Sequence, residues 1–210
     1  MSKRFFAAGF LLILVIAACS PADSSAPSVD APNTAPTIAP DADGAQTDSA
    51  PSLLESVARA GADRPAWMST VLTNAETGTT FTLGDFPEKT VYIELMATWC
   101  TNCRIQQGNV RDVSAKLSAD SYVFISLSVE PKDTTDGLKQ YRVQYNYPWT
   151  FAVVPPDMLA ALVEQFGPSV TNPTATPHLV IAPSGSVSQL ATGIHSADQL
   201  SAELTTAAGA

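Results

Sequence analysis

The chain has 210 residues, and 45% of them are hydrophobic, so it can bury an ordinary core and is not wholly disordered. Its 11 basic and 20 acidic side chains give a formal net charge of −9, which argues against nucleic acid as a partner, because phosphate neutralisation needs clustered Lys and Arg. The three cysteines, Cys19, Cys100 and Cys103, can form at most one disulfide, which excludes a disulfide scaffold.

Residues 1–18 have the layout of an export signal. Lys3 and Arg4 precede an uncharged run from Phe5 to Ala18, which is shorter than the roughly 20 apolar residues of a permanent membrane span. A basic start, a short apolar run and small residues are typical of a secretory signal peptide. A soluble export signal with a stray cysteine, or an uncleaved short anchor, are the alternatives.

The end of this run, Ile16-Ala17-Ala18-Cys19, resembles the lipobox of bacterial lipoproteins. The resemblance implies cleavage before Cys19, which then carries lipid and holds the protein on the outer side of a bacterial membrane. Several acyl chains at one terminus give stable anchoring, whereas a single chain binds only marginally. Cys19 would then be consumed, leaving Cys100 and Cys103 for chemistry outside the cytoplasm.

Residues 19–51 are predicted to be the lipidated cysteine and a disordered tether. Residues 20–51 contain six of the 16 prolines, five Asp and no Lys or Arg, and such a composition cannot bury enough apolar surface to order itself. Residues 52–67 are expected to form an N-terminal helix and a connector, because Ser52-Leu53-Leu54-Glu55 is a capping-box pattern. The globular domain is expected over residues 68–208.

Within that domain, strands and helices are predicted to alternate. The expected strands and helices, in chain order, are a hairpin of strands 70–73 and 79–83, strand 91–96, helix 101–117, strand 122–129, helix 135–145, strand 149–154, helix 157–166, strands 178–182 and 187–191, and a helix from about residue 196. This order predicts an α/β domain with a mixed sheet.

Trp99-Cys100-Thr101-Asn102-Cys103 lies where a buried strand is predicted to turn into a helix. Two residues between cysteines on a first helical turn bring the sulfurs within reach of a disulfide. Free amide groups at a helix N-terminus favour a thiolate, so Cys100, expected to be the more exposed, is the predicted nucleophile. Cys103 is placed to resolve a mixed disulfide formed at Cys100.

Residues 91–103 resemble the active-site segment of the thioredoxin superfamily, and the preceding Thr82-Leu83-Gly84-Asp85-Phe86 resembles its TlpA-like members. Thr176-Pro177 before an apolar strand is similar to the superfamily's cis-proline loop, which lies against the cysteines. The resemblance covers about residues 68–208. It implies a thioredoxin-like fold, with a central mixed sheet flanked by helices and an N-terminal β-hairpin extension. It also implies dithiol–disulfide exchange with protein partners, fed by a membrane or extracytoplasmic electron donor, without a cofactor.

Two further residues are assigned to this site. Glu94 lies six residues before Cys100, where thioredoxins carry a buried acid, and a carboxyl there has a raised pKa and can accept the Cys103 proton; the alternative is an edge-strand Glu paired with Lys89. Trp99 is expected to shield the sulfurs or to pack as an ordinary aromatic. Thioredoxin-like proteins of cytochrome c maturation often carry Glu three residues after the second cysteine. Here that position is Gln106, which argues against membership of that subgroup.

Other functions remain open. The cysteines could form half of a zinc site or a static bridge, although a closed zinc site needs four ligands. Residues 129–134 resemble the segment after a strand in Sco-type copper chaperones, which implies Cu(I) binding by Cys100, Cys103 and His178. The Sco motif, however, separates its cysteines by three residues, and its histidine lies further upstream of the last strand. His178 is most simply a neutral strand residue and His195 a loop residue. A lipoprotein with an inert thioredoxin-like fold is the third alternative.

Overall fold

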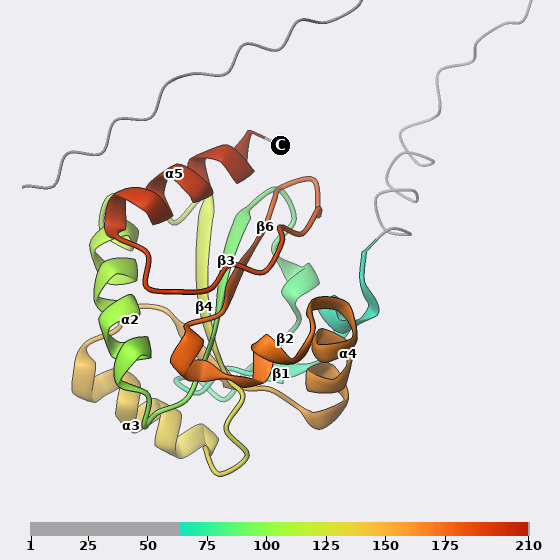
Figure 1. Ribbon diagram of the computed structural model, residues 1–210, viewed down its shortest axis with the longest axis vertical. Helices are drawn as coiled ribbons and strands as arrows, with labels where there is room; N and C mark the ends of the chain where they lie inside the picture. The colour runs from blue at the N-terminus through green and yellow to red at the C-terminus, as the bar shows by residue number, and fades with distance from the viewer. Residues whose placement is uncertain (1–63, 210) are drawn as a thin grey trace, which may run out of the picture. The chain divides into compact units, whose positions relative to one another are not determined.

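The computed structural model describes residues 64–209, so the predicted signal, tether and first helix lie outside the described residues. The central feature is a four-stranded sheet (Figure 1), whose strands are β3 (Thr90–Met96), β4 (Tyr122–Ser128), β5 (Thr150–Val153) and β6 (His178–Ile181). Their order is β5-β4-β3-β6. Strands β3, β4 and β5 are parallel and β6 runs antiparallel to β3, so the predicted mixed sheet is confirmed.

Four α-helices flank this sheet: α2 (Thr101–Ser114), α3 (Thr135–Tyr145), α4 (Pro156–Phe166) and α5 (Ala197–Ala208). Four short 3-10 helices join them: η1 (Ala66–Ser69), η2 (Leu83–Asp85), η3 (Pro168–Thr171) and η4 (Pro173–Ala175). The Thr134 side chain caps α3, and a reciprocal Ser196–Gln199 capping box starts α5. Among residues 64–209, no helix combines the length and the apolar character needed to cross a bilayer.

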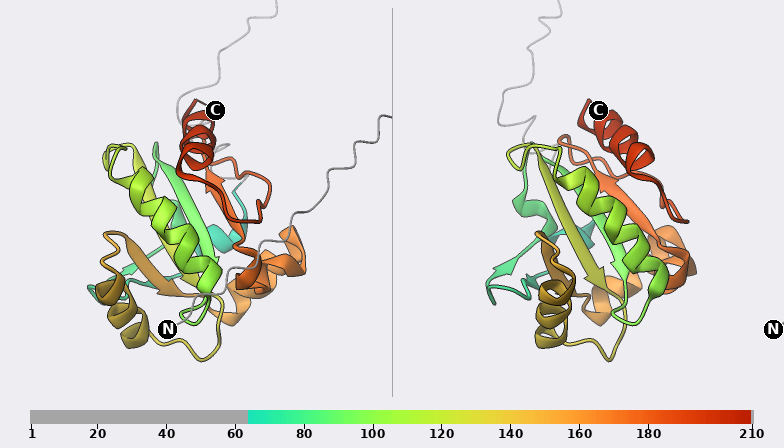
Figure 2. Two further views of the ribbon diagram at one scale, coloured as in Figure 1. Left: turned by 60° about the vertical axis from the view of Figure 1, so that its left-hand side comes forward. Right: turned by 90° about the vertical axis from the view of Figure 1, so that its left-hand side faces the viewer.

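The helices divide between the two faces of the sheet (Figure 2). One buried cluster joins the apolar side chains of α4 and η1 to Val91, Ile93 and Leu95 of β3. The other joins side chains of α2, α3 and α5 to Tyr92 and Met96 of the same strand. Alternate residues of a strand point to opposite faces, and all seven residues of β3 are buried. Strand β3 therefore lies between two cores, and helix α2 covers only one of them.

The expected N-terminal hairpin is present but short. Strands β1 (Leu72–Thr73) and β2 (Thr80–Phe81) pair antiparallel. The turn between them is closed by Asn74, whose side chain accepts a hydrogen bond of 2.8 Å from the backbone N–H of Glu76. The backbone N–H of Ala75 donates to the carbonyl of Phe151 in β5 at 2.8 Å, which docks the hairpin against the sheet.

The strand predicted at residues 187–191 is wrong. This segment makes only isolated bridges, from Ala191 to His178 and from Val187 to Ile181. Between them, the Ser188 hydroxyl accepts the hydrogen bond from the backbone N–H of Val180, at 2.9 Å. A side chain thus takes the place of a backbone carbonyl and interrupts the ladder, as serine side chains commonly do.

Candidate functional site

The cysteine pair lies where β3 turns into α2. Cys100 is the N-cap of α2, and its Sγ accepts a hydrogen bond of 3.1 Å from the backbone N–H of Cys103. The turn before it is anchored by Asp133, whose carboxylate accepts hydrogen bonds from the Thr98 backbone N–H at 3.0 Å and from the Thr98 hydroxyl at 2.6 Å. The sulfurs are therefore presented by a fixed turn at the positive end of a helix.

Cys100 and Cys103 form a disulfide, with their Cα atoms 5.3 Å apart. This separation is within the 4.4–6.8 Å that a disulfide requires. The two cysteines, separated by two residues on the first turn of α2, thus bring their sulfurs together as predicted. What the arrangement can do chemically depends on how partners reach them.

The expectation that Cys100 is exposed is wrong, because both cysteines are 0% exposed. The 3-10 helix η4 covers them, and we call Pro173–Ala175 the cap. The carbonyl oxygen of Pro173 lies 3.3 Å from Cys100 Sγ and 3.2 Å from Cys103 Sγ. The side-chain amide of Asn102 donates to the carbonyl of Thr174 at 2.8 Å and holds the cap on α2.

The cap leads directly into the predicted Thr176-Pro177 loop. No peptide bond among residues 64–209 is cis, so the bond between these two residues is trans and the expected cis-proline is wrong. Thr176 has a left-handed φ of 46°, which is strained for a β-branched residue and turns the chain from the cap into β6. The carbonyl of Pro177 accepts from the N–H of Leu95 at 2.9 Å, which extends the pairing of β6 with β3, while Pro173 supplies the carbonyl that faces the sulfurs.

Glu94 is completely buried in the middle of β3. It points to the same face of the sheet as its neighbours in the register, Ser126 and His178. Burial raises its pKa from the ordinary value of 4.5 to about 8, although a hydrogen bond of 3.3 Å from the Ser126 hydroxyl opposes the shift. The alternative of an exposed pair with Lys89 does not apply, since Lys89 Nζ donates to the carbonyl of Ala119.

Two further side chains flank the cysteine pair: Trp99 in the turn before α2 and Gln106 on α2 itself. Trp99 is 54% exposed and donates from Nε1 to Glu130 at 2.8 Å, so it is not an ordinary core aromatic. Gln106 is buried; its amide donates to the Tyr92 hydroxyl at 3.3 Å and its oxygen accepts from the backbone N–H of His195 at 2.8 Å. The Gln106 side chain thus joins β3 to the His195 loop.

The two histidines meet in space, which the sequence analysis did not foresee. His178 is buried at the start of β6, and its ring lies against that of His195, with centroids 4.6 Å apart. Both rings contact Glu203 of α5. These three form the only group of three or more His, Cys, Asp or Glu among residues 64–209 whose ligand atoms could share one ion. The copper ligands predicted from the sequence, Cys100, Cys103 and His178, do not form such a group in the described part of the chain.

No protein-family model and no curated protein matches the chain. Solved structures do. One is a thiol:disulfide interchange protein of the thioredoxin family from Chlorobium tepidum (20% identity, TM-score 0.59, covering 69% of this chain and 95% of that one). Another is the exposed lipoprotein thioredoxin Etrx1 of Streptococcus pneumoniae (20%, 0.52, 65% and 98%). BsSco, a member of the Sco family of cytochrome c oxidase assembly proteins, also matches (21%, 0.53, 66% and 90%). The fold is thioredoxin-like, as expected.

Proposed function

We propose that this protein is a thiol–disulfide oxidoreductase that exchanges the Cys100–Cys103 pair with protein thiols and disulfides. The observation that carries the proposal is the disulfide itself, formed at the N-terminus of a helix that follows the central strand of a thioredoxin-like fold. A bridge that spans two residues removes little entropy from the unfolded chain, so a purely stabilising role would gain little.

Exchange proceeds in two steps. In the reduced protein the Cys100 thiolate attacks one sulfur of a partner disulfide, forms a mixed disulfide and expels the first partner thiolate. The Cys103 thiolate then attacks Cys100 Sγ and expels the second, so that two electrons pass from the dithiol to the partner and the Cys100–Cys103 bond forms. The reverse sequence oxidises a partner dithiol. The backbone N–H of Cys103, 3.1 Å from Cys100 Sγ, favours the Cys100 thiolate.

Glu94 is the proposed proton acceptor for Cys103. With a pKa of about 8, its carboxyl can gain and lose a proton near neutral pH, whereas an ordinary Glu stays ionised there. It is buried on the face of the sheet that α2 covers, together with Ser126. Glu94 is therefore placed to act as an internal acceptor for the proton that Cys103 releases.

The cap has to move before either step can take place. Attack on a disulfide needs a third sulfur in line with the bond, and the Pro173 carbonyl occupies the space beside both sulfurs. Opening costs the hydrogen bonds from Asn102 to the Thr174 carbonyl and from the Gly193 N–H to the Ala175 carbonyl, together with one turn of 3-10 helix. We therefore propose that partners are admitted by displacement of residues 173–175, with no cofactor required.

We also propose that the protein acts outside the cytoplasm, tethered to the membrane by lipid on Cys19. The support is the lipobox-like sequence before Cys19 and the Pro-rich composition of residues 20–51. The similar S. pneumoniae protein is itself described as an exposed lipoprotein. Labelled palmitate should enter the protein, and Cys19→Ser should abolish the label and release the protein from the membrane fraction. Equal labelling of the variant would contradict the anchor.

Copper transfer is the second candidate, and similarity to BsSco favours testing it. Two thiolates and an imidazole suit Cu(I). In the structure, however, the two His178 ring nitrogens contact the Thr176 carbonyl and Glu203, so copper would have to replace one of these contacts. A Cu(I) titration of the reduced protein, with and without His178→Ala, separates the two functions. Binding that depends on His178 would favour the copper function.

The exchange mechanism is tested by trapping its intermediate. Cys103→Ser should accumulate a mixed disulfide with a disulfide-containing substrate such as insulin, because Cys100 attacks and nothing resolves the adduct. Intact-mass measurement should find the adduct in this variant and none in Cys100→Ser. If the adduct instead forms in Cys100→Ser and is absent from Cys103→Ser, the assignment of the nucleophile is wrong.

A further inference from the structure

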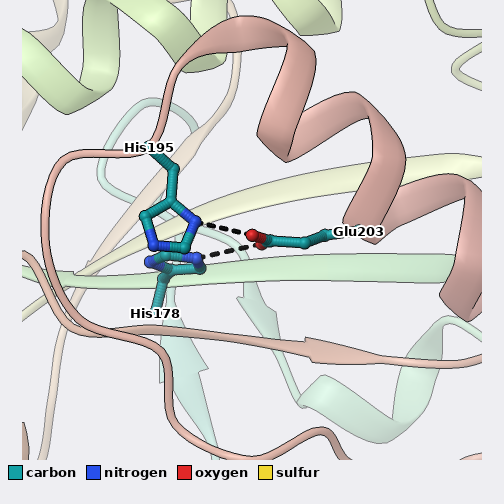
Figure 3. Close-up of side chains that lie close together, drawn as sticks. All are labelled: His178, His195 and Glu203. Atoms are coloured by element: carbon teal, nitrogen blue, oxygen red, sulfur yellow. Dashed lines mark hydrogen bonds and ion pairs between the residues drawn. The ribbon is translucent and has the colours of Figure 1, made fainter. Parts of the chain in front are cut away.

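A second polar cluster lies beside β6, outside the cysteine site (Figure 3). It brings together His178 from the start of β6, His195 from the loop before α5, and Glu203 from α5 itself. His178 Nε2 lies 3.1 Å from one carboxylate oxygen of Glu203, and His195 Nδ1 lies 2.6 Å from the other. One nitrogen from each ring and one carboxylate oxygen all lie within 4.8 Å of one another.

The contacts of His178 are satisfied by either tautomer of its ring. With the hydrogen on Nε2, the ring donates to the Glu203 carboxylate at 3.1 Å; with the hydrogen on Nδ1, it donates to the carbonyl oxygen of Thr176 at 3.3 Å. The second tautomer turns the lone pair of Nε2 toward Glu203, and in this form Nε2 can bind a metal ion.

The ligand atoms are held in place by contacts of their own. The hydrogen bond from His178 to Thr176 fixes its ring with Nε2 turned toward the cluster. The His195 backbone is tied to α2 at both ends, because its N–H donates to Gln106 and its carbonyl accepts from Asn109, each at 2.8 Å. A backbone carbonyl on the non-ligating nitrogen is the usual outer contact of a metal-binding histidine.

The cluster is open to the outside on one side. A cavity of about 550 Å³ lies between β6, the segment of residues 186–191 and α5, and its lining includes His178 and Glu203 among small side chains such as Ala191, Ala202 and Ala207. The Glu203 side chain is 34% exposed. An ion and a further ligand can therefore reach His178 and Glu203 from this cavity without passing through the core.

We propose that His178, His195 and Glu203 bind one divalent transition-metal ion of the Zn²⁺ type. Two imidazoles and a carboxylate are a donor set that zinc uses with three protein ligands and a fourth position left for water or an added ligand, which here faces the cavity. The set contains no thiolate, so it is distinct from a Cu(I) site on the cysteines.

The ligand atoms have to move together to bind one ion. Two ligand atoms bonded to one tetrahedral zinc at about 2.0–2.1 Å lie about 3.3 Å apart. One nitrogen of each ring and one carboxylate oxygen lie within 4.8 Å of one another, so no pair has to close by more than about 1.5 Å. His195 Nδ1 faces the Glu203 carboxylate, so its ring binds the ion in the tautomer that carries the hydrogen on Nε2.

The test measures metal binding in the absence of free thiols. The full chain in mild detergent is kept oxidised, alkylated to block Cys19, stripped with a chelator and titrated with Zn²⁺ against a chromophoric competitor. We expect one ion per chain by mass spectrometry of the metal. Co²⁺ in its place should give visible d–d bands without sulfur charge-transfer absorption. An oxidised, alkylated chain that takes up no stoichiometric Zn²⁺ would overturn the proposal.

Matched variants locate the ion. Glu203→Gln keeps the shape of the side chain, and His195→Ala changes a half-buried loop residue, so both should fold, as circular dichroism will check. Each should weaken Zn²⁺ binding by at least about tenfold. Asp198→Asn, an equal charge change at an exposed position of α5, should leave the affinity unchanged. Equal affinity in the wild type, Glu203→Gln and His195→Ala would assign the ion elsewhere and overturn the site.

Discussion

The two faces of the central sheet differ in chemistry, although the same strands supply both. On the α4 face, β3, β4 and β6 present only aliphatic side chains, among them Val91, Ile93, Leu95, Ile125, Leu127, Leu179 and Ile181. On the α2 face, alternate residues of the same strands include Glu94, Ser126, Ser128 and His178, all buried. Both cysteines pack on this second face.

Buried polar groups are costly unless they are paired, so their confinement to one face separates two roles. The α4 face supplies stability through apolar burial. The α2 face buries polar groups, which lower its contribution to stability. These groups include the sulfurs, a carboxyl with a raised pKa and a pair of histidines, which are the groups that can carry out chemistry. Substitutions on the first face should change the free energy of unfolding, and those on the second should change chemistry. Four experiments test this division.

The largest effect is expected at Cys100. Replacing this sulfur with Cys100→Ser removes the proposed nucleophile and should abolish insulin reduction, while the domain keeps its fold because the hydroxyl can still cap α2. Turbidity measures the activity and circular dichroism the fold. Insulin reduction at the wild-type rate in this variant would show that Cys100 is not the nucleophile and that the α2 face does not carry the chemistry in this way.

The second effect concerns stability alone. Leu95 is fully buried on the α4 face. Leu95→Ala should lower the free energy of unfolding by about 2–5 kcal/mol, because the lost transfer free energy of the side chain and the cost of the cavity add. Urea unfolding measures the loss, and insulin reduction by the folded fraction should be unchanged. Ile105→Ala, at a half-exposed apolar position on α2, is the control and should fall within about 0.5 kcal/mol of the wild type. A redox defect in folded Leu95→Ala would show that the faces are not separate.

The third effect is a pH dependence at Glu94. Its folded pKa of about 8 is above the ordinary 4.5, so the folded state holds a proton that the unfolded state releases between these values. The free energy of unfolding should therefore fall as pH rises from about 5 to 8, by roughly 1 kcal/mol per unit from this group. Glu94→Gln should remove that slope and slow the resolution step. The same slope in both proteins, by urea unfolding at a series of pH values, would remove Glu94 from the proton pathway.

The smallest effect is expected at the cap. Asn102→Ala deletes the hydrogen bond to Thr174, worth about 1 kcal/mol, so opening should become about fivefold more frequent and reduction by dithiothreitol correspondingly faster. Asn109→Ala on the same helix removes a similar contact that does not touch the cap, and should leave the rate unchanged. Equal rates in the wild type and in Asn102→Ala would mean that the cap does not limit access.

Local signals were sufficient for the central elements. The apolar run of β3, the Cys100–Cys103 spacing and the start of the last helix near residue 196 each depend on neighbouring residues, and the structure contains them. Burial of the sulfurs depends instead on Pro173, 70 residues after Cys103, and no periodicity reports such a contact. The interrupted strand at residues 187–191 follows from one serine hydroxyl that competes with the backbone.

The histidine cluster shows the same limit. His178, His195 and Glu203 are separated by 17 and 8 residues, a spacing typical of no metal motif, and they meet only because β6 and α5 pack together. Gln106 could be read only as a departure from a family pattern. In the structure its amide joins Tyr92 to the His195 loop, and no pattern in the sequence predicts these two contacts.

A redox titration tests the central claim most directly. The protein is equilibrated in mixtures of reduced and oxidised dithiothreitol, quenched by alkylation and weighed, so that the fractions of disulfide and dithiol are counted at Cys100 and Cys103. A pair that serves exchange should titrate reversibly as a single two-electron couple, from either starting state. A disulfide that stays closed in the folded protein across the whole series, and opens only when the chain is unfolded, would make the pair a static bridge and contradict the account.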